Sequence, residues 1–402
     1  MSDVSDQYDF FPATREHALL RLEHFLPNAG RRYAETRNTD FGPDQRLGTS
    51  CLSPYLSRRM LLEEEVGRAA VAEHGPGDAD KFVSEVFWRT YFKGWLELRS
   101  HVWTLYQEAI ELALDSLSTE RRRAYDRAVA GETGIACFDD WARELAQVGY
   151  LHNHTRMWFS SIWIFTLRLP WVLGADFFYR HLLDGDAASN TLSWRWTAGL
   201  HTRGKAYAAR VSNIRKHTNG RYDPSGLNEH PEPLEDDWNG EAEGLPSPPP
   251  PKEGARTFFL LHDDELHPES LNPKRFDITG LGGVTATPGR SPLGVAERVL
   301  RFSEEALADA LGRGSRRFGR EGRPLLPEEI GEAAKASGAE QIVAFYPPQG
   351  PVHDLLSRLA PELESEGVPL RFILRDYDRQ AWPSCDRGFF KLRKQIPRLL
   401  GA

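Results

Sequence analysis

The sequence predicts a mainly α protein, in which a helical domain is followed by a small α/β domain with a parallel, Rossmann-like sheet. Apolar residues recur at helical spacing through the first half of the 402-residue chain. Beyond residue 257, short apolar runs alternate with helical segments, as in parallel sheets with crossover helices. The stretch between these parts is rich in Pro, Gly and acidic residues and has no periodic apolar face. The expected boundaries are a helical domain over residues 10–221, a linker over 222–256 and an α/β domain over 257–402.

The first helices are expected in TREHALLRLEHFL (14–26) and in the aromatic-rich DKFVSEVFWRTYFKGWLELR (80–99). Thr14 is a suitable N-cap for the first of them, because its side-chain oxygen can accept a hydrogen bond from a free backbone N–H. Both segments have apolar residues three and four positions apart, which places one apolar face against a core.

Residues 138–169 are predicted to form two helices, the first capped by Asp139 or Asp140 and ended by Gly149. The most apolar run, MWFSSIWIFTLRLPWVLGADFF (157–178), is interrupted by an arginine and a proline before 18 residues. This interruption favours a buried helix over a membrane span, and no membrane partner is predicted.

Strands of the α/β domain are expected in TFFLLH (257–262), EQIVAFY (340–346) and PLRFILRD (369–376), with helices over residues 296–314 and 352–367. The glycine-rich GLGGV (280–284) follows no clear strand, so a phosphate loop is not predicted there. The sequence also lacks the GxGxxG and GxxxxGK[ST] patterns of nucleotide-binding loops.

Charge and cysteine content limit the function classes. The net charge of −8 argues against a generally basic nucleic-acid coat, yet residues 195–221 contain seven Lys and Arg and no acid. That stretch predicts either a local DNA-binding surface or a solvated helix face. The three cysteines lie far apart, which predicts no disulfide framework and fits the reducing cytoplasm. His152 and His154 diverge on a helix, so no metal site is predicted.

Four segments place polar groups close together. Glu85, Trp88 and Arg89 lie at helical spacing, and so do Asn153, Arg156 and Met157. GTSCLSPYL sets hydroxyls before a helix start, where phosphate can bind, and LLDGDAASNTLSWRW puts acids just before two tryptophans. Taken singly, each has a simpler interpretation, such as a surface ion pair or an ordinary helix start. Buried acids beside aromatic rings nevertheless need a partner.

Together these segments resemble the photolyase/cryptochrome flavoproteins. The resemblance rests on FFPATREHALLRLEHFL, LGTSCLSPYL, KFVSEVFWRTYF, GYLHNHTRM and LLDGDAASNTLSWRW, which occur in the family's order over about residues 10–220. TFFLLHDDELHPESLN and GFFKLRKQIPRLL resemble the start and end of the family's α/β domain, which normally comes first. The resemblance therefore implies that this domain is shortened and displaced to the C-terminus.

The resemblance implies one non-covalent FAD as the partner of the acids. Asn190 would face the flavin N5 edge, Asp184 and Asp186 would line the isoalloxazine, and Arg156 would balance their charge. The phosphates and the remaining edges would be held by Thr49, Ser50, Leu52, Ser53, Arg89, Asn153 and Tyr33. An antenna chromophore is left unassigned.

The resemblance also implies a substrate. Glu85, Trp88, Asn153, Met157 and Trp196 match positions that contact a flipped cyclobutane pyrimidine dimer, and photolyases are base-flipping enzymes. Enzymes for the (6-4) lesion carry histidines at the positions of Asn153 and Met157. The implied function is a monomeric deoxyribodipyrimidine photolyase (a lyase) that repairs DNA by electron transfer from excited FADH⁻, with Arg203, Lys205 and Arg210 on the DNA.

The family's electron chain uses three tryptophans. Trp194 and Trp171 match the inner two, whereas the outer position aligns near Ala128, so Tyr125 is the expected substitute. Cys51 and His154 replace family arginines and weaken the positive charge near phosphate. These departures and the acidic total charge keep open the alternative of a cryptochrome-like blue-light receptor, and more distantly that of a light-independent flavin redox enzyme.

Overall fold

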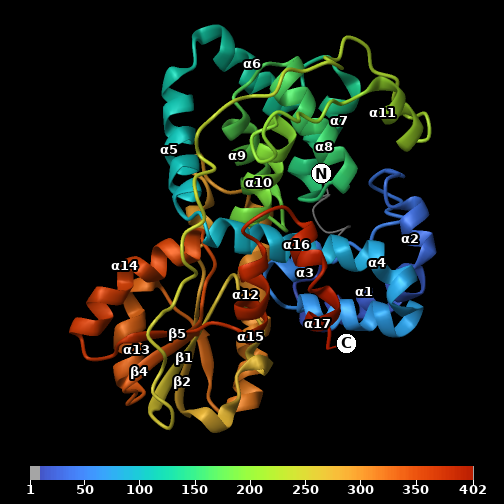
Figure 1. Cartoon of the computed structure of the whole chain (residues 1–402). Coiled ribbons are helices and arrows are strands. Elements are labelled where there is room, and N and C mark those ends of the chain that lie inside the picture. Colours follow the sequence, from blue (N-terminus) through green and yellow to red (C-terminus); the bar gives the residue numbers. More distant parts are fainter. Residues whose placement is uncertain (1–9, 402) are drawn as a thin grey trace, which may run out of the picture.

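The computed structural model describes residues 10–401, which form a helical part and a five-stranded sheet flanked by helices (Figure 1). This confirms the predicted fold class. The helical part contains α1 (Arg15–Phe25), α2 (Arg31–Thr36), α3 (Ser53–Ser57), α4 (Glu63–Glu97), α5 (His101–Ser116), α6 (Thr119–Ala130), α7 (Ala136–Val148), α8 (Asn153–Ser161), α9 (Trp171–His181), α10 (Ala187–Ala198) and α11 (Val211–His217).

The helix starts and stops follow local chemistry. Thr14 caps α1, since its hydroxyl accepts a hydrogen bond from the His17 N–H at 3.2 Å, and Gly149 ends α7 with a left-handed φ of 73°, both as predicted. The predicted aspartate cap of α7 is wrong, because the helix begins at Ala136. The Asp139 carboxylate instead accepts N–H bonds at 2.8 Å from Thr133 and Gly134 in the preceding turn. None of the helices in the described residues is both long and apolar enough to span a membrane.

The sheet is wholly parallel, with strand order β3-β2-β1-β4-β5. Figure 1 shows α13 and α14 on one side of it and α12 and α15 on the side toward the helical part. The elements are β1 (Arg256–His262), β2 (Asp277–Val284), α12 (Glu297–Phe318), β3 (Gly322–Pro324), α13 (Ile330–Ala336), β4 (Gln341–Phe345), α14 (Pro351–Ser365), β5 (Leu370–Ile373), α15 (Asp376–Ala381), α16 (Phe390–Arg393) and α17 (Ile396–Leu399).

The glycine-rich GLGGV stretch lies inside β2, a strand that was not predicted from the sequence. A Cβ at Gly282 would lie 2.5 Å from Leu325, and one at Gly283 would lie 2.7 Å from Leu307. The glycines therefore let neighbouring core side chains reach the strand. Three of the eight residues of β2 are glycines, which are depleted in strands, and this weakens the strand signal of Ile278, Thr279 and Val284.

The helical part and the sheet share one core. A single cluster of buried apolar residues contains side chains of both, and the Tyr55 and Phe302 rings meet across the junction at 6.2 Å. Buried Arg59, just after α3, pairs with Asp378 of α15 and with Glu265, which follows β1. Residues 222–255 contain no helix or strand and run along the helical part, where Trp238 packs on Trp171 at 5.7 Å.

Glu97 at the end of α4 gives this junction a pH dependence. It accepts hydrogen bonds from the Gln349 N–H at 2.6 Å and the Tyr346 hydroxyl at 3.0 Å, and burial raises its pKa to about 7. When the pKa of a buried acid is higher in the folded than in the unfolded protein, the free energy of unfolding falls as the pH rises from the unfolded pKa to the folded pKa.

The free energy of unfolding of the wild type should fall between pH 5 and pH 8. In Glu97→Gln we expect this fall to be smaller by about 2–3 kcal/mol. Urea unfolding at both pH values measures this difference, with the exposed Glu241→Gln as the control. Identical pH dependence in wild type and Glu97→Gln would contradict the assignment.

Candidate flavin site

Three of the predicted cofactor residues lie together: Ser53 at the start of α3, Arg156 on α8, and Asp184 just before α10. Arg156 on α8 donates two hydrogen bonds to Asp184, at 3.0 and 2.9 Å. Although burial alone raises the pKa of Asp184, the Arg156 guanidinium and the Ser53 hydroxyl hold it below its ordinary value. Asp184 therefore stays ionised inside the protein, and Ser53, Arg156 and Asp184 form one connected group.

A second group lies at the N-terminus of α10. Asp186 caps this helix by accepting the Ser189 N–H at 2.7 Å and also pairs with Arg89 of α4. Asn190 follows one turn later and donates through its amide nitrogen to the Ala175 carbonyl at 2.8 Å. That bond fixes the amide and leaves its oxygen as the acceptor. Asp186 and Asn190 thus share one face of α10.

The remaining donors suit an anionic, acceptor-rich cofactor. The side chains of Asp184 and Asp186 are 2% and 4% exposed, whereas those of Arg156 and Arg89 are 23% and 12% exposed. The accessible polar surface of the two ion pairs therefore belongs to the arginines. The half-buried Thr49 and Ser50 lie in the turn before α3, and Leu52 is fully buried beneath it. Such residues fit the FAD that the sequence implies.

Sequence reasoning missed the partner of Glu85. Glu85 and Arg89 are spaced for an i,i+4 pair, but Glu85 pairs with Arg37, just after α2, and Arg89 pairs with Asp186. The simpler interpretation as a surface pair is therefore wrong. Tyr33 lies beside the Arg37–Glu85 pair, and burial and the Glu85 charge raise its pKa. The pairing joins residues too far apart in the chain for helical periodicity to indicate it.

Trp88 also has an unpredicted partner. Its ring stacks on Phe389, with centroids 4.1 Å apart and planes 11° apart. The expected contact residues Asn153 and Met157 lie on the first turns of α8, Asn153 exposed and Met157 half-buried. Trp196 packs against Tyr207 with centroids 5.5 Å apart. Phe389 thus covers the face of the Trp88 ring on which the family resemblance would place a flipped base.

The candidate electron-transfer rings form two contact sets. Trp194 contacts Trp163 at 6.2 Å, and Trp163 contacts Tyr125 at 6.0 Å. Trp171 contacts Tyr106 at 5.9 Å and Trp238, in the segment after the helical part, at 5.7 Å. Trp163 and Trp238 were not predicted; both lie beside residues that were.

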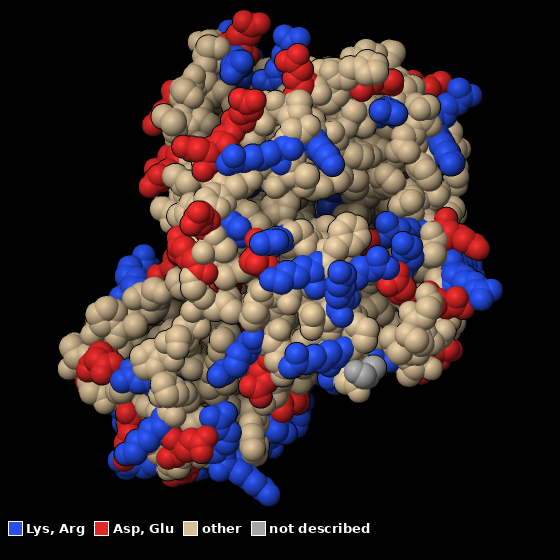
Figure 2. Space-filling view, in the orientation of Figure 1, with Lys and Arg blue, Asp and Glu red and all other residues tan. Residues whose placement is uncertain are grey.

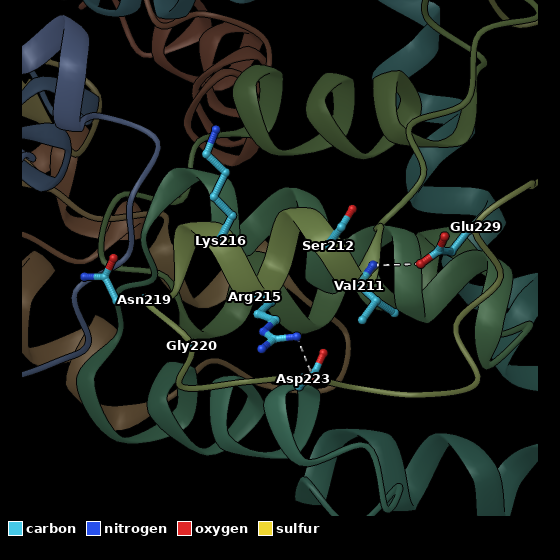
Figure 3. Close-up of a pocket in the computed structure, with 8 residues that line it drawn as sticks. All are labelled: Val211, Ser212, Arg215, Lys216, Asn219, Gly220, Asp223 and Glu229. Carbon is cyan, nitrogen blue, oxygen red and sulfur yellow. Dashed lines mark hydrogen bonds and ion pairs between the residues drawn. The ribbon is translucent and has the colours of Figure 1, made fainter.

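The basic stretch is partly neutralised within the protein. Arg203, Lys205 and Arg210 are exposed, as a DNA contact requires. Arg195 is instead buried and bonded to Asp236 by both guanidinium ends, at 2.5 and 3.0 Å, so it is unavailable to DNA. A groove of about 690 Å³ lies beside α11. Figure 3 shows that Arg215 pairs there with Asp223 and that the Val211 N–H donates a hydrogen bond to Glu229. Acids after residue 222 thus lie against the basic stretch.

Comparison with known proteins identifies the helical part. Residues 82–227 match the family model described as the FAD binding domain of DNA photolyase. The chain is similar to the deoxyribodipyrimidine photo-lyase of Neurospora crassa, with 29% identity over 228 residues, 54% of this chain and 36% of that protein. It is also similar to cryptochrome DASH of Danio rerio, with 32% identity over 193 residues, 46% of this chain and 35% of that protein.

A bacterial class III photolyase from Agrobacterium tumefaciens superposes with a TM-score of 0.40 and 25% identity, over 51% of this chain and 43% of that one. The chain spans 35% to 46% of the length of the curated relatives described by these matches. The family model ends at residue 227, so the displacement of the α/β domain stays a prediction. The acid–arginine pairs of α8 and α10 lie inside the matched segment, and residues 82–227 belong to the family of FAD-binding domains of DNA photolyases.

Proposed function

We propose that the protein binds one FAD and acts as a deoxyribodipyrimidine photolyase on cyclobutane pyrimidine dimers. The observation that carries this proposal is a pair of neighbouring groups, Ser53–Arg156–Asp184 and Arg89–Asp186 with Asn190. They contain six of the eleven residues expected for the cofactor, and their arginines are the accessible members of the two ion pairs.

Each side chain has a defined task in this proposal. When bound and reduced, FAD supplies a light-absorbing electron donor. Arg89 and the hydroxyls of the turn before α3 would hold its phosphates, as cations and hydroxyls hold phosphate elsewhere. The Asp184–Arg156 pair would orient the ring and stay neutral overall. The Asn190 amide is held in place by its bond to the Ala175 carbonyl, and its oxygen would accept a hydrogen bond from an N–H of the flavin ring.

The substrate would be a pyrimidine dimer flipped out of DNA. Trp88 and Trp196 would stack on it, and Glu85 and Asn153 would hydrogen-bond its edge, with Met157 alongside. Trp88 is half-buried and already holds an aromatic ring in stacking geometry. We infer that a flipped base takes the place of Phe389 on Trp88.

The same contacts favour a second candidate, a blue-light receptor. A repair enzyme would offer Trp88 and Glu85 to the lesion. Here Trp88 is stacked on Phe389, and Glu85 is paired with Arg37. A receptor has no need to release them. Repair activity distinguishes the two functions.

The deciding experiment illuminates the purified, FAD-loaded and reduced protein with an oligonucleotide that contains one thymine dimer. We expect dimer loss on chromatography and preferential binding of the damaged strand. Trp88→Ala should reduce this preference by roughly ten- to a hundredfold, because aromatic stacking on a base contributes about 1–3 kcal/mol. Arg203→Ala is the control and should weaken binding to damaged and intact strands alike.

Equal binding of damaged and intact strands, with dimers left whole under blue light, would replace the repair proposal with the receptor. A purified protein that neither contains nor takes up FAD would refute both.

A further inference from the structure

The aromatic face of α4 lies between two basic segments that are far apart in the sequence. Trp88, Tyr91, Phe92 and Trp95 recur at helical spacing on this face. The Tyr91 hydroxyl hydrogen-bonds to His201 at 3.1 Å, inside the basic stretch 195–221. The Tyr91 ring also contacts the Phe389 ring, with centroids 5.9 Å apart, and Phe389 lies in the C-terminal segment 386–398. The C-terminal segment therefore lies beside the surface predicted to bind DNA.

The C-terminal segment 386–398 is fixed to the helical part by specific contacts. Arg99 donates to the Asp386 carbonyl at 3.0 Å, and Arg393 pairs with Asp80 at 2.7 Å. Leu392 and Phe389 are buried. These contacts set the orientation of α16 and α17, so the outward-facing side chains of the segment form a defined surface.

That surface combines charge with an aromatic ring. Phe390 is 72% exposed, and Arg387, Lys391, Lys394 and Arg398 are exposed beside it in the sequence. Lys391 pairs with Asp386, and Arg387 also acts on Asp386 electrostatically, without an ion pair at contact distance. None of the ion pairs among residues 10–401 includes Lys394 or Arg398. Figure 2 shows Lys and Arg side chains gathered over the region where Figure 1 places α16 and α17.

We propose that residues 387–398 form a second DNA-binding surface, which holds a strand next to the aromatic face of α4. The unpaired cations bind phosphates, and Phe390 stacks on an unpaired base, the combination by which proteins bind single strands. The inference rests on the proposed function, since it extends the surface on which the substrate would lie.

The first test removes charge. The triple variant Arg387→Ala, Lys394→Ala, Arg398→Ala is compared with the matched triple Lys274→Ala, Arg316→Ala, Arg358→Ala, whose cations are equally exposed on the sheet part. FAD-loaded proteins are titrated with a labelled 16-nucleotide strand and its duplex at several salt concentrations. We expect the first triple to reduce the slope of log K against log salt by about two to three on duplex DNA, since each phosphate contact contributes roughly 0.9. The control triple should match wild type.

The second test removes the ring. Phe390→Ala should weaken binding of the single strand by roughly tenfold and binding of the duplex far less, because only an unpaired base is free to stack. Leu112→Ala is the matched control, since Leu112 is 71% exposed on α5. Both side chains are too exposed for the substitution to endanger folding.

The outcomes separate this inference from the function it rests on. If wild type binds and repairs damaged DNA but the two triples behave alike, the C-terminal surface is refuted and the photolyase proposal stands. If wild type binds no DNA, both fail. If the first triple loses only its binding to phosphatidylserine vesicles, the surface belongs to a membrane contact and the inference is overturned.

Discussion

Arg59→Met is expected to lower the free energy of unfolding by about 3–5 kcal/mol, because removing one partner of a buried ion pair leaves its counter-charges unpaired. Arg59 is buried and bonds to Asp378 at 2.5 and 2.8 Å, to Glu265 at 3.2 Å and approaches Glu63 at 3.7 Å. Methionine fills a similar volume but neutralises none of these carboxylates. Urea unfolding at pH 7 measures the loss.

The loss should also depend on pH. Burial alone raises the pKa of Glu265, but Arg375 and Arg59 lower it to about 2. A carboxylate with a depressed pKa stabilises the fold above its unfolded pKa and loses that contribution as the pH falls through the folded value. The difference between wild type and Arg59→Met should therefore shrink as the pH drops below about 4. Arg256→Met is the control, because its pair with Glu340 is exposed and should change stability by less than about 1 kcal/mol.

Trp194→Phe is expected to slow light-driven reduction of the bound flavin more than about tenfold, the effect of a barrier increase of roughly 1.4 kcal/mol. Trp194 is buried between Phe178 at 5.1 Å and Trp163 at 6.2 Å, and phenylalanine is much harder to oxidise than tryptophan. The measurement is the bleaching of oxidised flavin absorbance under blue light with an external electron donor.

Three further variants then locate the route beyond Trp194. Slow reduction in Trp163→Phe and Tyr125→Phe would place it along the Trp163–Tyr125 contacts. Slow reduction in Trp171→Phe alone would place it toward Trp238. Unchanged kinetics in Trp194→Phe would contradict every route that starts at this ring.

The sequence predicts those features that depend on neighbours in the chain. Thr14 and Gly149 were recognised because caps act within one helical turn. The strand β2 was missed because Gly280, Gly282 and Gly283 serve the packing of distant side chains rather than strand propensity. The same limit applies at the site. The residue types of the flavin cluster were predicted, but the pairing of Glu85 with Arg37 and the stacking of Phe389 on Trp88 depend on the fold as a whole.

The shared core of the two parts bears on how the chain is assembled. The Arg59 network and the Tyr55–Phe302 contact join the helical part to the sheet without help from the segment 222–255. That segment packs on the helical part through Asp236 and Trp238 and also tethers the two parts, which raises the effective concentration of one part near the other. A tether can join two parts in either order, provided that it spans the distance between their ends. An interface of this kind lets gene rearrangement change the order of the parts while the contacts between them persist.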